Sequence, residues 1–150
     1  RHDVHFRFVG DGSVKGELMR SAEGLTNVSF ADPVELEQVP VELGRCTASL
    51  VTLRDDPFYL RTRPARTFPS LACARPVIFA GGGDFATMVR EQGCGQVVPP
   101  GVAEALAQAV ETYADDPDLA ATQGRAGARY AHDNYSWSVL IGRWLKKVVL

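Results

Sequence analysis

Short apolar segments alternate with amphipathic segments along almost the whole chain, and glycine-rich turns separate them. This alternation limits the fold strongly, because strands that alternate with helices pair in parallel and form a sheet covered by helices. The expected strands are residues 4–9, 27–30, 48–53, 76–80 and 95–99. We therefore predict an α/β fold with a Rossmann-like parallel sheet and helices on both faces.

Helices are expected between and after these strands, where apolar residues recur at helical spacing. The expected helices are residues 14–23, 35–44, a short helix starting near Pro64, a helix opened by residues 81–84 and closed by Gly93, and residues 102–114, 118–133 and 136–150. In the second of these helices, Leu36, Val39 and Leu43 are expected to point inward.

The turns after the first four strands contain glycine, proline or charged residues. Ligands of open parallel sheets bind at the carboxyl ends of the strands, where such turns meet. The four turns are Gly-Asp-Gly at 10–12, Ala-Asp-Pro at 31–33, Arg-Asp-Asp at 54–56 and Gly-Gly-Gly at 81–83. We expect a binding crevice here, with backbone amides approaching a ligand at the glycine, proline and aspartate turns.

Residues 53–80 contain a loop with many arginines that leads into a short helix. Arg54, Arg61, Arg63 and Arg66 lie within thirteen residues of one another, together with two aspartates. Cationic side chains beside the first amides of a helix favour an anion. The alternative is a solvated loop in which these arginines pair with Asp55 and Asp56.

Composition excludes several classes of function. The net charge is −2, so no global field attracts nucleic acid or an anionic membrane. The three cysteines are widely spaced and form no C-x-x-C pair, which indicates buried free thiols in a reducing compartment and argues against a metal site. No apolar run approaches the roughly 20 residues that span a bilayer, and no signal peptide is evident.

Six motifs in one order resemble the C-terminal, donor-binding half of retaining glycosyltransferases of the GT-B fold, family 4 (group 1). They are FVGDG (8–12), NVSFADPV (27–34), VTLRDDP (51–57), RPARTFPSLACARPVI (63–78), GQVVPPG (95–101) and YSW (135–137). The resemblance covers nearly the whole chain. It implies a single nucleotide-sugar donor-binding domain, residues 1–150, cut from a larger two-domain protein whose acceptor-binding N-terminal domain is a further partner.

The resemblance also implies a donor site. The nucleotide base would lie beside the turn after the second strand, and the diphosphate would meet Arg66, at the position of the family's lysine. Glycines in the first turn would let the backbone approach the donor, and Arg54 would flank the sugar or phosphate. No residue is assigned to catalysis. The implied donor-binding residues are Gly10, Asp11, Gly12, Phe30, Asp32, Pro33, Val34, Arg54, Arg66 and Thr67.

Two departures from the family pattern count against catalysis. Pro69 stands where the family has a glutamate that bonds the donor ribose, and in mid-helix a proline would kink or shorten the helix. The first βα unit of the family, which carries a diphosphate-binding turn and the central strand of the order 3-2-1-4-5-6, has no counterpart. The sheet would then have to close up, recruit another segment or borrow a strand from a partner.

Together these features predict a glycosyltransferase that moves a sugar from a nucleotide sugar to an acceptor in glycan or glycoconjugate synthesis, without a cofactor or metal. The isolated 150 residues are expected to turn over nothing. The alternative is a degenerate, non-catalytic domain that binds a nucleotide or partner. A dinucleotide oxidoreductase is disfavoured, because the sequence after Gly12 lacks the third glycine of G-x-G-x-x-G.

The last helix carries tryptophans and aliphatic residues on one side and basic residues on the other. It is expected to pack on its own domain or on the missing one. The alternative is a basic amphipathic helix that lies on a membrane surface, which would place a cytoplasmic protein peripherally on the inner membrane face. Nucleic acid is not expected as a partner.

Overall fold

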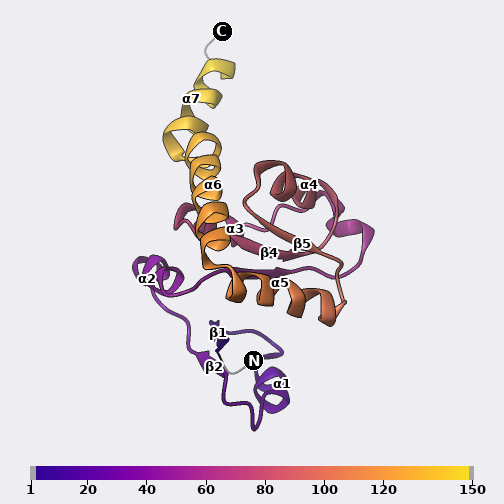
Figure 1. Cartoon of the computed structure of the whole chain (residues 1–150). Helices are drawn as coiled ribbons and strands as arrows, with labels where there is room; N and C mark the ends of the chain where they lie inside the picture. The colour runs from indigo at the N-terminus through magenta and orange to yellow at the C-terminus, as the bar shows by residue number, and fades with distance from the viewer. Residues whose placement is uncertain (1–2, 149–150) are drawn as a thin grey trace. The chain divides into compact units, whose positions relative to one another are not determined.

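The computed structural model describes residues 3–148, and the chain divides into two compact units (Figure 1). The N-terminal unit comprises residues 1–41 and the C-terminal unit residues 42–150. Helix α2 (Val39–Gly44) contains the boundary between them. The prediction of one donor-binding domain stays a prediction.

The N-terminal unit is a small parallel βαβ element. It consists of β1 (Phe6–Val9), α1 (Lys15–Ser21), β2 (Val28–Ala31) and a 3-10 turn η1 (Leu36–Gln38). The two strands pair in parallel from Phe6↔Val28 to Val9↔Ala31. The rings of Phe8 and Phe30 stack with their centroids 5.0 Å apart, which covers part of the strand surface.

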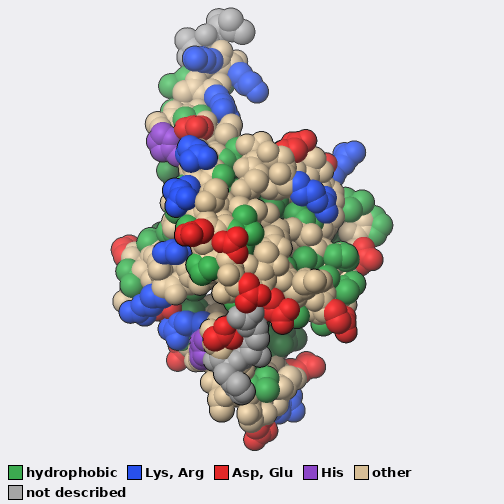
Figure 2. Space-filling model, viewed as in Figure 1, with side chains coloured by type: hydrophobic (Ala, Val, Ile, Leu, Met, Phe, Trp, Pro, Cys, Tyr) green, Lys and Arg blue, Asp and Glu red, His purple; other side chains and the backbone are tan. Residues whose placement is uncertain are grey.

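The C-terminal unit is built on three parallel strands in the order β3-β4-β5. They are β3 (Ser49–Thr52), β4 (Val77–Ala80) and β5 (Gly95–Val98). The helices are η2 (Pro57–Arg61), α3 (Thr67–Ala72), α4 (Gly83–Gln92), α5 (Ala103–Asp115), α6 (Pro117–Tyr135) and α7 (Trp137–Val148). In Figure 1, α7 extends beyond the end of α6, and Figure 2 shows Lys and Arg side chains at this end of the C-terminal unit.

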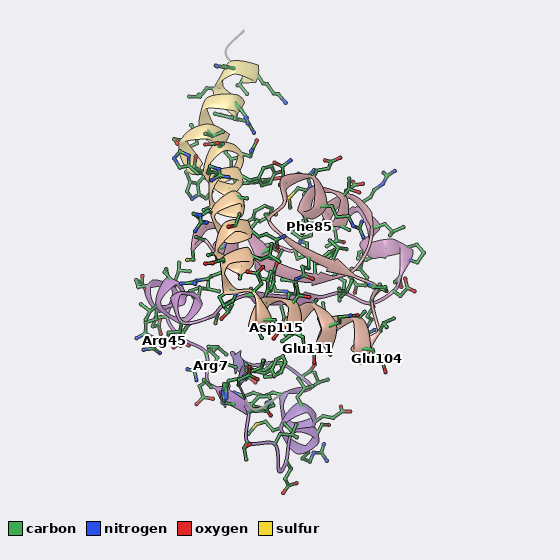
Figure 3. All side chains as sticks on the ribbon, viewed as in Figure 1. Arg7, Arg45, Phe85, Glu104, Glu111 and Asp115 are labelled. Atoms are coloured by element: carbon green, nitrogen blue, oxygen red, sulfur yellow. The ribbon has the colours of Figure 1, made fainter. Side chains whose placement is uncertain are left out.

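Helices cover both faces of the three-stranded sheet, as the alternating sequence predicts. Every residue of the central strand β4 is buried. Val77 and Phe79 pack on one face with α3, α4 and the end of α6, including Phe85 (Figure 3). Ile78 and Ala80 pack on the other face with α5 and the start of α6. The exposed acidic residues Glu104, Glu111 and Asp115 follow the outer side of α5 (Figure 3).

The five strands form two sheets rather than one. Within residues 3–148, β1 pairs only with β2, and β3 pairs only with β4. In the family order 3-2-1-4-5-6, strand 1 has no counterpart here. Without it the order divides into 3-2 and 4-5-6, which correspond to β2-β1 and β3-β4-β5. Among residues 3–148 the strands are β1 to β5, and how the sheet is completed stays a prediction.

Three local expectations were wrong. Helix α3 starts at Thr67 rather than near Pro64. Leu36 is largely exposed, because the chain forms η1 there before α2 begins. The cysteines are free, as expected, but only Cys94 is fully buried, whereas Cys46 and Cys73 are half-buried.

Candidate functional site

The predicted site residues fall into two sets, one in each unit. Seven belong to the N-terminal unit and three to the C-terminal unit. Both sets lie at or after the carboxyl ends of parallel strands, where ligands of such sheets bind.

The turn after β1 depends on its glycine. Gly10 has φ +129°, a conformation that side chains with a Cβ rarely adopt, and its N–H donates to the carbonyl of Ala31 at 3.1 Å. The Asp11 carboxylate accepts the N–H of Gly12 at 2.8 Å, and this bond restrains the turn that precedes α1. Gly10, Asp11 and Gly12 therefore lie next to the end of β2.

A lysine that the sequence reasoning missed lies at the same place. Lys15, the first residue of α1, donates from Nζ to the Asp32 carboxylate at 3.0 Å and to the Ala31 carbonyl at 3.5 Å. Lys15 is mostly covered, whereas Asp32 is almost fully exposed. The available signal was the position of Lys15, the third residue after Gly12 and the start of the helix. This pair places a cation beside the predicted base-binding turn.

The other predicted residues of this set surround the end of β2. Phe30 is half-buried against Phe8, Pro33 is exposed and Val34 is half-buried. A surface depression lined by Glu17, Arg20 and Ser21 lies on α1, and none of its lining residues is a predicted site residue.

In the C-terminal unit, Arg66 is fixed at the end of β3. Its Nη2 donates to the carbonyl of Thr52, the last residue of the strand, at 3.0 Å, and the rest of the side chain is exposed. The alternative of an Arg66–aspartate pair is not what the structure shows: between residues 3 and 148, no ion pair joins Arg66 to Asp55 or Asp56. Asp56 instead caps η2 by accepting the N–H of Phe58 at 2.8 Å.

Because α3 starts late, Pro69 lies near the start of the helix rather than in its middle. Residues 64–66 form a turn, in which the N–H of Thr67 bonds to the carbonyl of Pro64 at 3.0 Å. Pro69 is then the third residue of the helix, where an N–H would have no helical partner anyway. Helix α3 is short, six residues, and starts late, which agrees with the expected shortening, while the family's glutamate is still missing.

Arg54 and Thr67 differ sharply in their surroundings. Arg54 is exposed directly after β3. Thr67 is fully buried, and its hydroxyl has no hydrogen-bond partner within the described residues. The roles of both in donor binding stay predictions.

Leu60 of η2 lies against the glycine turn that follows β4. Gly83 has φ +74°, and a Cβ there would overlap the carbonyl oxygen of Leu60 in η2. A Cβ on Gly82 would lie 3.3 Å from the Leu60 side chain. The glycines of this turn accommodate the loop between β3 and α3, and the expectation that the turn approaches a ligand stays a prediction.

Arg63 of that loop and Phe68 of α3 both contact Tyr135 at the end of α6. The Phe68 and Tyr135 rings lie 4.3 Å apart, and Arg63 donates from Nη1 to the Tyr135 hydroxyl at 3.0 Å. Burial, with a further contribution from Tyr135, raises the pKa of the neighbouring Tyr130 to about 12. Arg63 thus has a structural role. These contacts fix the chain on both sides of Arg66 and do not involve the Arg66 side chain.

The described residues contain no group of three or more His, Cys, Asp or Glu that could hold a metal ion. Among residues 3–148, no helix is long and apolar enough to cross a membrane. The expectation that no cofactor is needed stays a prediction.

Comparison with known proteins identifies the family. The sequence model of the family "Glycosyl transferases group 1" matches residues 1–116, which include all ten predicted site residues. The chain belongs to this family. A search of curated protein sequences finds no match.

Solved structures show the fold of this group 1 chain. HepE from Anabaena in complex with UDP-glucose is similar with a TM-score of 0.79 and 20% identity, over 97% of this chain and 40% of that one. Sucrose-phosphate synthase from Thermosynechococcus elongatus has a TM-score of 0.76 and 22% identity, over 95% and 38%. S. aureus TarM, solved with UDP, has a TM-score of 0.76 and 17% identity, over 95% and 28%.

These likenesses confirm the predicted α/β, Rossmann-like fold. The chain spans about two fifths of the length of the first two proteins, 38% and 40%.

Proposed function

We propose that these residues form the donor-binding half of a glycosyltransferase that moves a sugar from a nucleotide sugar to an acceptor, with retention, in glycan or glycoconjugate synthesis. The family match across both sets of site residues supports sugar transfer in general. The complexes of HepE with UDP-glucose and with UDP support a nucleotide sugar as the donor.

The hydrogen bond that fixes Arg66 at the end of β3 is the observation on which the proposal rests. A guanidinium has five N–H donors in a planar fork, and here one of them is used by the Thr52 carbonyl. The bond to the strand end restrains the side chain and leaves other donors toward solvent. An arginine held in this way can bind a phosphate and stabilise the negative charge that a leaving diphosphate develops.

The residues after β1 and β2 would bind the nucleoside. In this proposal the base lies beside Phe30, Asp32, Pro33 and Val34, and the turn at residues 10–12 approaches the donor. Lys15 holds the Asp32 carboxylate at 3.0 Å, so the base-binding turn is restrained by an ion pair.

The test is nucleotide binding by the full-length polypeptide that contains these residues. In calorimetry with UDP, GDP and their sugars, Arg66→Ala should weaken binding by roughly 1.5–3 kcal/mol, because hydrogen bonds to a charged phosphate are lost. Arg90→Ala is the matched control, since Arg90 is an exposed arginine in the last turn of α4. Equal affinity of Arg66→Ala and the unaltered protein would remove Arg66 from the site.

A second candidate is a non-catalytic domain that binds a nucleotide or a partner. Pro69 favours it, because proline supplies no carboxylate for the ribose. Nucleotide binding in the millimolar range or tighter, together with sugar transfer by the full-length polypeptide, would exclude this candidate. Binding without transfer or donor hydrolysis would support it. Transfer by the isolated 150 residues would contradict our proposal that they form only the donor half.

A further inference from the structure

Asp32 presents its carboxylate to solvent from the turn that follows β2. Its side chain is 95% exposed, whereas the side chain of Lys15, with which it forms an ion pair of 3.0 Å, is 22% exposed. The Lys15 ammonium also donates to the Ala31 carbonyl at 3.5 Å, and the N–H of Gly10 bonds to the same carbonyl at 3.1 Å. The lysine is therefore attached to the end of the strand, and it holds an accessible carboxylate in one place.

Stability alone gives little reason for this pair. An ion pair with one partner almost fully in water contributes little to folding, because solvent screens it. A donor molecule with a diphosphate is an anion, and an unpaired carboxylate in its site would repel it. Lys15 compensates the charge of Asp32 and still leaves the carboxylate open to a ligand.

The pair presents its hydrogen-bonding groups in a fixed order. An ionised carboxylate only accepts hydrogen bonds, and an ammonium has three donors and no acceptor. Within residues 3–148, one oxygen of Asp32 accepts from Lys15 and the other has no partner, while two of the three Lys15 donors are used. A ligand at this turn therefore meets one donor followed by two acceptors.

Guanine is the common base whose edge has the complementary order. Its O6 acceptor, N1–H donor and N2 amino donor lie side by side, so each can face its opposite in the pair. Uracil has a carbonyl oxygen on each side of its ring N–H, and one of these oxygens would meet a carboxylate oxygen. Adenine and cytosine have a ring nitrogen acceptor at the middle of the edge, which would also meet the carboxylate.

We propose that Lys15 and Asp32 recognise guanine and that the donor is a GDP-sugar, an inference that rests on the donor site proposed above. Asp32 accepts from N1–H and from the N2 amino group, and Lys15 donates to O6. These hydrogen bonds involve charged groups and are stronger than those between neutral groups. The base differs from that of HepE, whose complexes contain UDP-glucose or UDP.

Calorimetry with nucleoside diphosphates tests this assignment in the full-length polypeptide that contains these residues. We expect GDP to bind at least about tenfold more tightly than UDP, CDP or ADP, because each of the others brings an acceptor against the carboxylate. Inosine diphosphate, which is GDP without the amino group, should bind about tenfold more weakly than GDP.

Asp32→Asn should change the preferred base rather than abolish binding. The amide places an N–H donor where a carboxylate oxygen was, so it opposes the guanine amino group and matches a carbonyl oxygen beside the ring N–H. GDP should bind at least about tenfold more weakly than to the unaltered protein. UDP and xanthosine diphosphate, which both have that carbonyl oxygen, should bind more tightly, a gain that misfolding cannot produce.

Asp118→Asn is the matched control. Asp118 is an exposed aspartate in the first turn of α6, and its replacement should leave every affinity unchanged. If UDP, CDP or ADP bound as tightly as GDP, the guanine assignment would be overturned and the proposed function would stand. A ratio of GDP to UDP affinity that Asp32→Asn leaves unchanged would also overturn it. Absence of binding by every nucleoside diphosphate would remove the proposed function and this inference together.

Discussion

Ala74 occupies a backbone position that usually needs glycine. Its φ is +55°, and no other non-glycine residue among those described has a positive φ. The N–H of Ala74 bonds to the carbonyl of Leu71, and the N–H of Arg75 bonds to that of Ser70, both at 2.9 Å. This is the Schellman end of a helix, in which the left-handed residue is most often glycine. The alanine therefore introduces local strain just before β4.

Ala74→Gly should therefore stabilise the protein. Relief of the left-handed conformation is worth roughly 1–2 kcal/mol, and the greater freedom of glycine in the unfolded chain offsets part of it. We expect a net gain of about 0.5–1 kcal/mol in the free energy of unfolding, measured by denaturant titration. Ala72→Gly, the same change within α3, should destabilise instead. A loss of stability in Ala74→Gly would show that the alanine side chain contributes packing that outweighs the strain.

At the scale of elements, the close contact between α6 and the α3–β4 connection holds the C-terminal unit together. Gly124 and Gly127 are one turn apart on the buried side of α6. A Cβ on Gly124 would overlap the carbonyl oxygen of Ala74, and a Cβ on Gly127 would lie 2.6 Å from a methyl of Leu71. The two glycines thus allow α6 to lie directly against the segment that carries Arg66 and Thr67.

Gly124→Ala should separate these elements. Because the clash is with backbone, α6 has to shift, and we expect a loss of about 1–3 kcal/mol in the free energy of unfolding. Gly142→Ala in α7 is the matched control: nothing lies within 4 Å of its Cβ, so the change should be neutral or stabilising by up to about 1 kcal/mol. Equal changes in stability for the two variants would show that the close contact at Gly124 does not limit the packing of α6.

At the scale of the whole molecule, the core buries groups that ionise at high pH. Burial raises the pKa of the Cys94 thiol from 9.0 to about 11. Burial also raises the pKa of Tyr113, with a smaller contribution from Cys94, and the Tyr113 hydroxyl bonds to Gln123. In the unfolded chain these groups lose their protons at lower pH than in the folded protein.

Stability should consequently fall as the pH rises above about 9. Between pH 9 and 11 the unfolded thiol is ionised while the folded one keeps its proton, so unfolding releases a proton and becomes easier with rising pH. Each group contributes at most about 1.4 kcal/mol per pH unit. Denaturant titrations from pH 8 to 11 should show a flatter decline for Cys94→Ala than for the unaltered chain. Parallel declines would mean that Cys94 is ionised equally in both states.

Much of this architecture follows from patterns that are local in the chain. The strand and helix positions, the positive φ of Gly10 and Gly93, and the alternation of core residues along β4 all depend on residues a few positions apart. Periodicity and turn chemistry report such short-range constraints directly. The candidate arginine at the start of α3 and the amphipathic character of α7 could be recognised in the same way.

Other features depend on pairs of residues that the fold brings together, which no periodic pattern encodes. Leu60 covers the Gly83 turn, Arg63 reaches Tyr135 seventy-two positions away, and Lys15 holds Asp32. The Arg66–Thr52 bond likewise replaces the aspartate pair that neighbouring charges suggested. For α7, the pattern showed an apolar stripe, but only the bonds of Arg143 to α6 decided that the stripe faces outward. Packing at close range selects one partner among several that the sequence makes chemically acceptable.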